Sequence, residues 1–219
     1  MKPLSNPLRI ALLITLVLTA VVGFVMVPAG TVLPVHWGLN GEADAFAPRE
    51  VALLMPLGIA VLVWAIFILL LPRVAKPGDV EAGRRPLGVV LTALTALALL
   101  IEAGVVLIGI GAEVQMVQAI AIALGMLMIV LGNAMPKSQR NSVAGIRIPS
   151  TLADPANWQA THRFAGLLAL AGGVLLILVA LVVPVNVLMW WVLACVFVPI
   201  ASGVIYSLTY DRTSPARKG

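Results

Sequence analysis

Charged residues and cysteines are both scarce in this chain. Only 11% of its 219 residues are charged, whereas 61% are hydrophobic. An average soluble domain is about half apolar and about a quarter charged. This number of charged residues could not cover the surface of a water-soluble fold of this size. The excess apolar residues must therefore face lipid. The single cysteine, Cys195, excludes an intrachain disulfide, and we expect it to be a small core residue.

Histidine is scarce as well. The chain contains two, His36 and His162, and neither has a second His or Cys at the spacing typical of metal motifs. The distribution of charge described below also predicts that they lie on opposite faces of the membrane. We therefore expect no metal site, no cofactor and no catalytic residue assignable from spacing alone.

What the chain does contain is long apolar runs. They are continuous and do not alternate with period two, which favours helices over a transmembrane barrel. A membrane span needs about 20 apolar residues, and we predict six, at 8–29, 51–71, 87–111, 114–135, 164–183 and 187–209. The first is longer than the apolar core of a signal peptide and is followed by further spans, so we interpret it as uncleaved. The sequence predicts an all-α membrane protein built as a bundle of six transmembrane helices.

Basic residues indicate the orientation of this bundle, because positive residues in short loops tend to stay in the cytoplasm. Arg49 alone lies in the first loop, among acidic residues. The other thirteen cations lie at the two ends and in the second and fourth loops: Lys2, Arg9, Arg73, Lys76, Arg84, Arg85, Lys137, Arg140, Arg147, Arg163, Arg212, Arg217 and Lys218. The pattern predicts that both termini are cytoplasmic. The net charge of +5 is then explained by the attraction of these cations to anionic lipid headgroups. No nucleic-acid partner is therefore expected.

Two loops are long enough to carry function. The outer loop, 30–50, is rich in turn-forming residues, which predicts a structured loop, either at the surface or partly re-entrant. Two interpretations of His36 and Trp37 stay open. Either Trp37 anchors the interface while His36 is merely hydrated, or both belong to an outward-facing ligand-binding surface.

The inner loop, 132–163, contains a helix start. Asp154 followed by Pro155 provides an N-cap carboxylate and a proline at the first helical position. A helix that starts there would run through Trp158 and His162, which share one face, into the fifth span.

The inner loop is also rich in polar residues. Its cations could simply fix topology and attract anionic headgroups, each contributing about 1 kcal/mol. The additional hydrogen-bonding side chains, Asn157 among them, leave room for an ordered polar site. The candidate residues of this inner polar site are Asn133, Lys137, Arg140, Asn141, Arg147, Thr151, Trp158, His162 and Arg163.

Glu102 lies well inside the third predicted span, where a carboxyl group is costly and is a candidate for function. By depth it falls in the outer half. It could meet His36, directly or through water, beneath the outer loop. Alternatively it is protonated and hydrogen-bonded to another helix. The candidate ligand-binding residues on the outer side are His36, Trp37, Asp44 and Glu102.

Both loops resemble a known family. The inner-loop motifs resemble the signature region of the SdpI family, the immunity proteins against a sporulation-delaying peptide toxin. The matching residues are Gly132-Asn133, Pro136-Lys137, Asn141, Gly145-Ile146-Arg147, Pro149, Thr151-Leu152, Trp158 and Thr161-His162-Arg163. The outer loop resembles the small N-terminal domain of unknown function that often accompanies this region, through Pro34, His36, Trp37, Gly41 and Asp44.

The chain also departs from the family pattern. Ile148 and Ser150 stand where the family has Thr and Trp. The missing Trp removes an aromatic contact from the inner loop.

The resemblance implies two units: an N-terminal two-span unit at 1–72 with the outer loop, and an SdpI-like four-span unit at 73–219 with the inner loop. It implies a multi-pass protein of the bacterial cell (inner) membrane that gives resistance to a secreted antimicrobial peptide. His36 and Trp37 would then contact the peptide outside. Arg140, Arg147 and His162 would signal to a cytoplasmic regulator.

Two other classes of function stay open. An intramembrane hydrolase or transferase could use His162 with Asn133 and Arg147, or with Ser142 or Ser150 as a nucleophile. On the outer side it could use His36 and Glu102. A small transporter could use Glu102, although one buried acid without a charged counterpart in another span is thin support.

Overall fold

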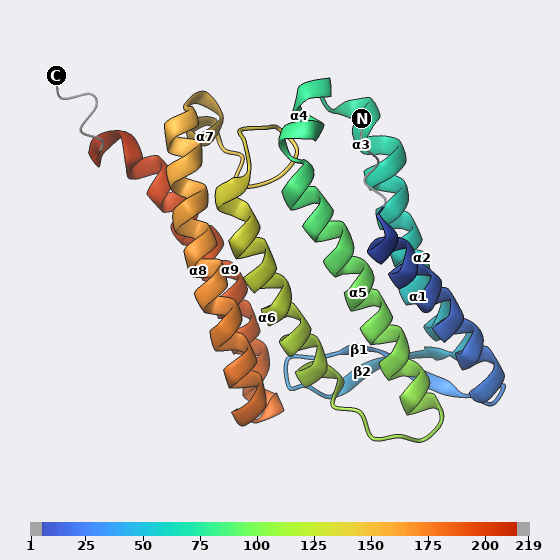
Figure 1. Cartoon of the computed structure of the whole chain (residues 1–219). Helices are drawn as coiled ribbons and strands as arrows, with labels where there is room; N and C mark the ends of the chain where they lie inside the picture. The colour runs from blue at the N-terminus through green and yellow to red at the C-terminus, as the bar shows by residue number, and fades with distance from the viewer. Residues whose placement is uncertain (1–5, 214–219) are drawn as a thin grey trace.

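Six long helices dominate the computed structural model, which describes residues 6–213 (Figure 1). Within those residues, six helices are long and apolar enough to cross a membrane, as predicted. They are α1 (Pro7–Met26), α2 (Arg49–Ala65) with its continuation into α3 (Leu71–Val74), α5 (Arg84–Gly109), α6 (Met116–Ala134), α8 (Pro155–Val182) and α9 (Val185–Thr213). Two short helices, α4 (Pro77–Ala82) and α7 (Pro149–Ala153), lie in the connections. The predicted cations Lys2, Arg217 and Lys218 lie outside the described residues.

Side-chain caps set where two of these helices begin. The carboxamide oxygen of Asn6 accepts from the Arg9 amide at 2.9 Å, with Pro7 in the first turn of α1. At α8, the Asp154 carboxylate accepts from the Ala156 amide at 2.8 Å and Pro155 follows it. The predicted helix start at Asp154 is therefore confirmed, and the helix runs without a break into the fifth span.

Helices α5 and α6 lie side by side in the middle of the bundle (Figure 1). Helices α1 and α2 pack on α5, whereas α8 packs extensively on both α6 and α9. The division into units at 1–72 and 73–219 stays a prediction. In space, however, the first helix of the second unit, α5, packs on both helices of the first.

Two glycine pairs bring the backbones of α6 and α8 together. A Cβ atom added to Gly166 would lie 2.7 Å from the carbonyl oxygen of Gly132, and one added to Gly173 would collide with the Gly125 carbonyl. Real Cβ atoms do not approach this closely. Small residues allow such close approach in membranes, where helices associate through packing and not through the hydrophobic effect. This seam fixes α8, and with it the inner loop, against α6.

The outer loop folds as an antiparallel hairpin of β1 (Val32–Trp37) and β2 (Ala43–Pro48). The sequence analysis predicted structure here but no strands, although Asn40-Gly41 is a hairpin signal. Leu33 is buried in a cluster with Val27 and Leu53, and Trp37 packs on the cluster formed by α6, α8 and α9. The hairpin thus crosses one end of the bundle and contacts both sides of it (Figure 1). We call this the hairpin end, and the opposite end, which carries residues 138–154, the loop end.

Candidate functional site

The predicted inner polar site divides into a buried part and an exposed part. Asn141, Thr151, Trp158 and His162 are each no more than 2% exposed. The predicted cations and Asn133 are exposed. The described residues therefore do not gather these side chains into one concave site.

Trp158 and His162 form the centre of the buried part. Their rings stack with centroids 4.0 Å apart and an interplanar angle of 21°. The Nε2 atom of His162 accepts from the Ile146 amide at 3.0 Å, which leaves Nδ1–H to donate to the Trp158 carbonyl oxygen at 2.8 Å. Both ring nitrogens are thus occupied by backbone groups, so the ring is not placed to act as a base.

Asn141 and Thr151 fold the loop around this ring pair. The carboxamide oxygen of Asn141 accepts from the amides of Val143 and Ala144 at 2.9 and 2.8 Å. The Thr151 hydroxyl donates to the Ile146 carbonyl oxygen at 2.7 Å and accepts from the Ile148 amide at 3.1 Å. These bonds satisfy backbone groups that would otherwise be costly to bury.

A second set of buried hydrogen bonds ties α8 to α9. Asn157 donates to the Ser207 carbonyl oxygen at 3.0 Å, and its side-chain oxygen accepts from the hydroxyls of Thr161 and Ser207 at 2.8 and 2.9 Å. Ser150 joins through its hydroxyl, 2.7 Å from that of Ser207. Sequence analysis missed Ser207, because a serine in an apolar span gives no signal of which helix it faces.

The Ser–His pairs considered for hydrolysis are not formed among the described residues. Ser150 contacts Ser207, and the Ser142 hydroxyl contacts the carboxylate of Asp79 in α4. His162 is held by Ile146 and Trp158. The hypothesis that Ser142 or Ser150 pairs with His162 as a nucleophile is therefore wrong.

Two of the exposed cations, Arg140 and Arg147, hold the loop through backbone carbonyl oxygens. Arg140 donates to the carbonyl oxygens of Leu152 and Ala153 at 3.0 and 3.3 Å, where α7 ends. Arg147 donates to the Ser142 carbonyl oxygen. Lys137 donates to Asn133, one turn earlier, at 3.0 Å. Arg163 points outward from α8 as an exposed residue.

At the hairpin end, His36 pairs with Asp44 and not with Glu102. The Nδ1 atom of His36 lies 2.5 Å from a carboxylate oxygen of Asp44 on the neighbouring strand, and the two side chains are 68% and 51% exposed. Glu102 is fully buried, and neither of its carboxyl oxygens has a hydrogen-bond partner within the described part of the chain. Direct pairing of His36 with Glu102 is wrong, and so is a hydrogen bond from Glu102 to another helix. The hairpin satisfies His36 locally.

An apolar cavity of about 370 Å³ lies beneath the hairpin. Its roof is Val35, His36 and Trp37 of β1, and its walls come from α2, α5, α6 and α9. The buried Thr95 on its wall accepts from the indole N–H of Trp64 at 3.0 Å and donates to the Leu91 carbonyl oxygen at 2.7 Å. Because the polar atoms of Thr95 are satisfied, the cavity offers an almost wholly apolar surface, with His36, the partner of Asp44, in its roof.

Side chains suited to a metal do not cluster in residues 6–213: no group of three or more His, Cys, Asp or Glu occurs there. The expectation of no metal and no cofactor stays a prediction.

Comparison with known proteins identifies the two regions. A model of the SdpI/YfhL protein family matches residues 137–207, and a model described as a domain of unknown function, DUF1648, matches residues 10–60. The first match covers most of the inner loop, α7, α8 and most of α9, and the second covers most of α1, the hairpin and much of α2.

Among curated proteins, the chain is 23% identical over 133 residues to "Immunity protein SdpI" of Bacillus subtilis (strain 168). The match covers 61% of this chain and 61% of the relative, so the chain spans less than two thirds of the length of that relative. No solved structure matches significantly. The two matches, the six apolar helices and the buried signature loop agree: the chain is a multi-pass bacterial cell-membrane protein whose residues 137–207 match the SdpI/YfhL family.

Proposed function

We propose that this protein is an immunity protein that binds a secreted peptide toxin at the hairpin end of the bundle. The observation that carries the proposal is the apolar cavity roofed by His36 and Trp37. It is supported by the resemblance to a protein named for immunity. The buried signature loop, by contrast, is occupied with its own backbone hydrogen bonds.

The cavity suits an apolar side chain of a membrane-active peptide. Its volume of about 370 Å³ is near the lower end of the range for ligand pockets, about 300–1,000 Å³. Trp37 offers a large, rigid aromatic surface, the residue type that most often dominates binding energy at interfaces. His36 in the roof, with its exposed partner Asp44, offers hydrogen-bonding groups to the peptide backbone.

The proposal requires the hairpin end to face outward. Its support is the charge distribution: the loop end carries the cations of the second and fourth loops, whereas the first loop contributes Arg49, paired with Glu50 at 2.9 Å. Both ends of the described chain lie at the loop end (Figure 1). By the rule that basic loops stay inside, this end is cytoplasmic.

A protection assay tests the proposal. A toxin-sensitive bacterium that expresses the protein is challenged with a peptide of the sporulation-delaying type, and the lethal dose is compared among variants matched for membrane level. We expect the wild type to protect and Trp37→Ala to lower the tolerated dose by about tenfold or more. The matched control is Trp190→Ala, because Trp190 on α9 is 59% exposed and does not line the cavity. No protection by the wild type, or equal protection by Trp37→Ala, would refute the proposal.

Signalling to a cytoplasmic regulator is a second part of the proposal, suggested by the family resemblance. The exposed loop around Arg140 and Arg147 is the surface available for such a partner. Arg147→Gln should then abolish a toxin-dependent transcriptional response while protection persists. A response that is unchanged in Arg147→Gln would argue against the loop as the contact.

A further inference from the structure

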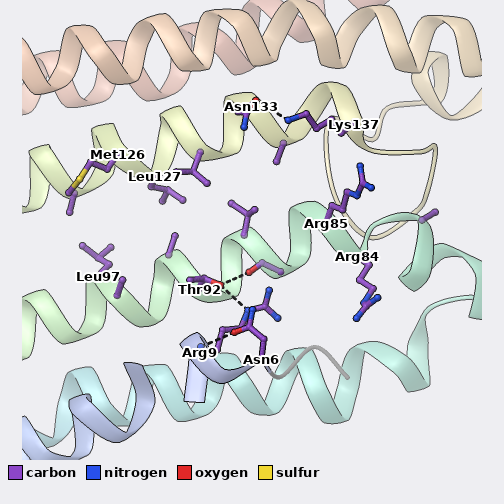
Figure 2. Close-up of a pocket in the computed structure, with 18 of the residues that line it drawn as sticks. Asn6, Arg9, Arg84, Arg85, Thr92, Leu97, Met126, Leu127, Asn133 and Lys137 are labelled. Atoms are coloured by element: carbon purple, nitrogen blue, oxygen red, sulfur yellow. Dashed lines mark hydrogen bonds between the residues drawn. The ribbon is translucent and has the colours of Figure 1, made fainter. Parts of the chain in front are cut away.

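A second, larger cleft lies at the loop end, between α1, α4, α5 and α6. Its volume is about 1580 Å³, and Figure 2 shows the side chains that line it. It belongs neither to the signature loop core nor to the cavity beneath the hairpin. Its walls come from both sides of the bundle, so it follows the junction of α5 and α6.

Four cations from three segments surround the mouth of this cleft: Arg9, Arg84, Arg85 and Lys137. The acidic side chain that lines it is Glu81, whose carboxylate lies 3.7 Å from Arg84. The mouth therefore keeps a positive excess after this pair is counted. Asn6, Asn133 and Gln139 add polar hydrogen-bonding groups there.

Arg9 is held in place at this mouth. Its Nε–H donates to the Thr92 hydroxyl at 2.8 Å, and that hydroxyl donates to the Gly88 carbonyl oxygen at 2.8 Å (Figure 2). Gly88 also makes the space, because a Cβ atom there would collide with the guanidinium. The bond to Thr92 uses the Nε–H of Arg9, and the residue is part of the cleft lining.

The rest of the cleft is apolar. Leu97, Leu100, Met126, Leu127 and Val130 line it farther from the mouth. In Figure 2 the labelled cations lie toward one end of the cleft, and Leu97, Met126 and Leu127 lie toward the other. Polarity thus changes along the helix axes, from a cationic mouth at the membrane surface to an apolar groove at hydrocarbon depth.

We propose that this cleft binds one anionic phospholipid, with its phosphate at the cationic mouth and an acyl chain along the groove between α5 and α6. Guanidinium groups bind phosphate through paired, charge-assisted hydrogen bonds, and basic pockets between transmembrane helices are suited to lipid headgroups. A soluble anion would use the mouth but leave the apolar groove unexplained. A peptide bound along the groove would need hydrogen-bonding partners for its backbone, but the deep wall of the groove is apolar.

The site also gives the lipid a structural role. It contacts α1 and α5 on one side and α6 on the other, so a bound lipid fills the junction between the sides of the bundle. This inference concerns the loop end and is independent of toxin binding at the hairpin end.

Native mass spectrometry of the full chain released from micelles tests the proposal, with phosphatidylglycerol and phosphatidylcholine of identical acyl chains as the probes. We expect retention of phosphatidylglycerol to exceed that of phosphatidylcholine by about tenfold, and the double substitution Arg84→Gln, Arg85→Gln to remove most of this preference. The matched control is Arg73→Gln, Lys76→Gln, which removes the same charge from exposed positions at the same end outside the cleft.

A third variant tests the groove without any change of charge. Ala96 is exposed and lines the cleft, so Ala96→Phe should keep the fold, checked by circular dichroism, and lower phospholipid retention by about fivefold or more. Equal retention of the two lipids, or equal loss in both double variants, would overturn the proposal. Competition by millimolar inorganic phosphate together with no effect of Ala96→Phe would show a site for a free anion and would also overturn it.

Discussion

Trp158 and His162 stack one helical turn apart on α8, with ring centroids 4.0 Å apart, while both imidazole nitrogens bond to backbone groups. The indole N–H donates to the Ser138 carbonyl oxygen at 3.2 Å, so the pair also anchors the start of the signature loop. The most chemically suggestive histidine of this protein is therefore part of the scaffold.

His162→Ala should destabilise the protein by about 2–4 kcal/mol, because it leaves the Ile146 amide without an acceptor and removes the aromatic stack. Reversible unfolding in mixed micelles measures this. Arg163→Ala, at the exposed neighbouring position, should change the free energy of unfolding by less than about 0.5 kcal/mol. A stable His162→Ala protein would contradict the scaffold role.

Gly145→Ala should be more destabilising than Gly30→Ala. Both glycines have positive φ, +113° and +82°, but an added Cβ at Gly145 would collide with the His162 ring, whereas at Gly30 it would meet nothing within 4 Å. Backbone strain costs about 1–3 kcal/mol at either site, and the collision adds to it at Gly145. Unfolding free energies of the two variants give the comparison. Equal losses would show that His162 moves aside freely.

Gly166→Ala should separate α6 from α8 and cost about 1–3 kcal/mol through overpacking. Gly58→Ala in α2 is the matched helical control, because an added Cβ there meets nothing within 4 Å. This control should be stabilising by about 0.5–1 kcal/mol, since alanine favours the helix. If both variants unfold alike, the close glycine contact is not what fixes the seam.

Glu102→Met should stabilise the fold by about 1–3 kcal/mol, because it replaces two buried carboxyl oxygens that lack hydrogen-bond partners with an apolar group. Glu102→Gln keeps a buried polar group and should gain less. If Glu102→Met is more stable but loses protection or transport, Glu102 is retained for function at a cost in stability. Destabilisation by Glu102→Met would instead reveal a polar partner of this carboxyl.

Cysteine labelling tests the orientation. In a Cys195→Ala background, Leu39→Cys in the hairpin turn should react with a membrane-impermeant maleimide in intact cells, because Leu39 is 54% exposed. Ala153→Cys at the end of α7 should react only after the membrane is opened. The reverse pattern would place the hairpin in the cytoplasm and would remove the basis for toxin binding there.

Much of the architecture was predictable because it is local in sequence. The apolar length of a span is a property of about 20 consecutive residues, and the start of α8 depends on the adjacent Asp154 and Pro155. The hairpin was predictable as well, because Asn40-Gly41 is a turn signal typical of two antiparallel strands. Some of the family-motif residues, Asn141, Thr151, Trp158 and His162, form a buried loop core, whereas their role as a site stays a prediction.

The sequence by itself determined that the chain forms six apolar helices and where its basic loops lie. A segment that crosses lipid must be apolar over a continuous stretch of residues, and such a stretch can be recognised without the fold. Only the tertiary structure decided which polar residues are scaffold and which are available. His162 and Thr151 find their partners in backbone groups near Ile146, whereas Glu102 finds none and His36 is satisfied by Asp44. A polar side chain looks the same in sequence whether its partner is a ligand, a lipid or a backbone amide, and only the packed position of that partner distinguishes them.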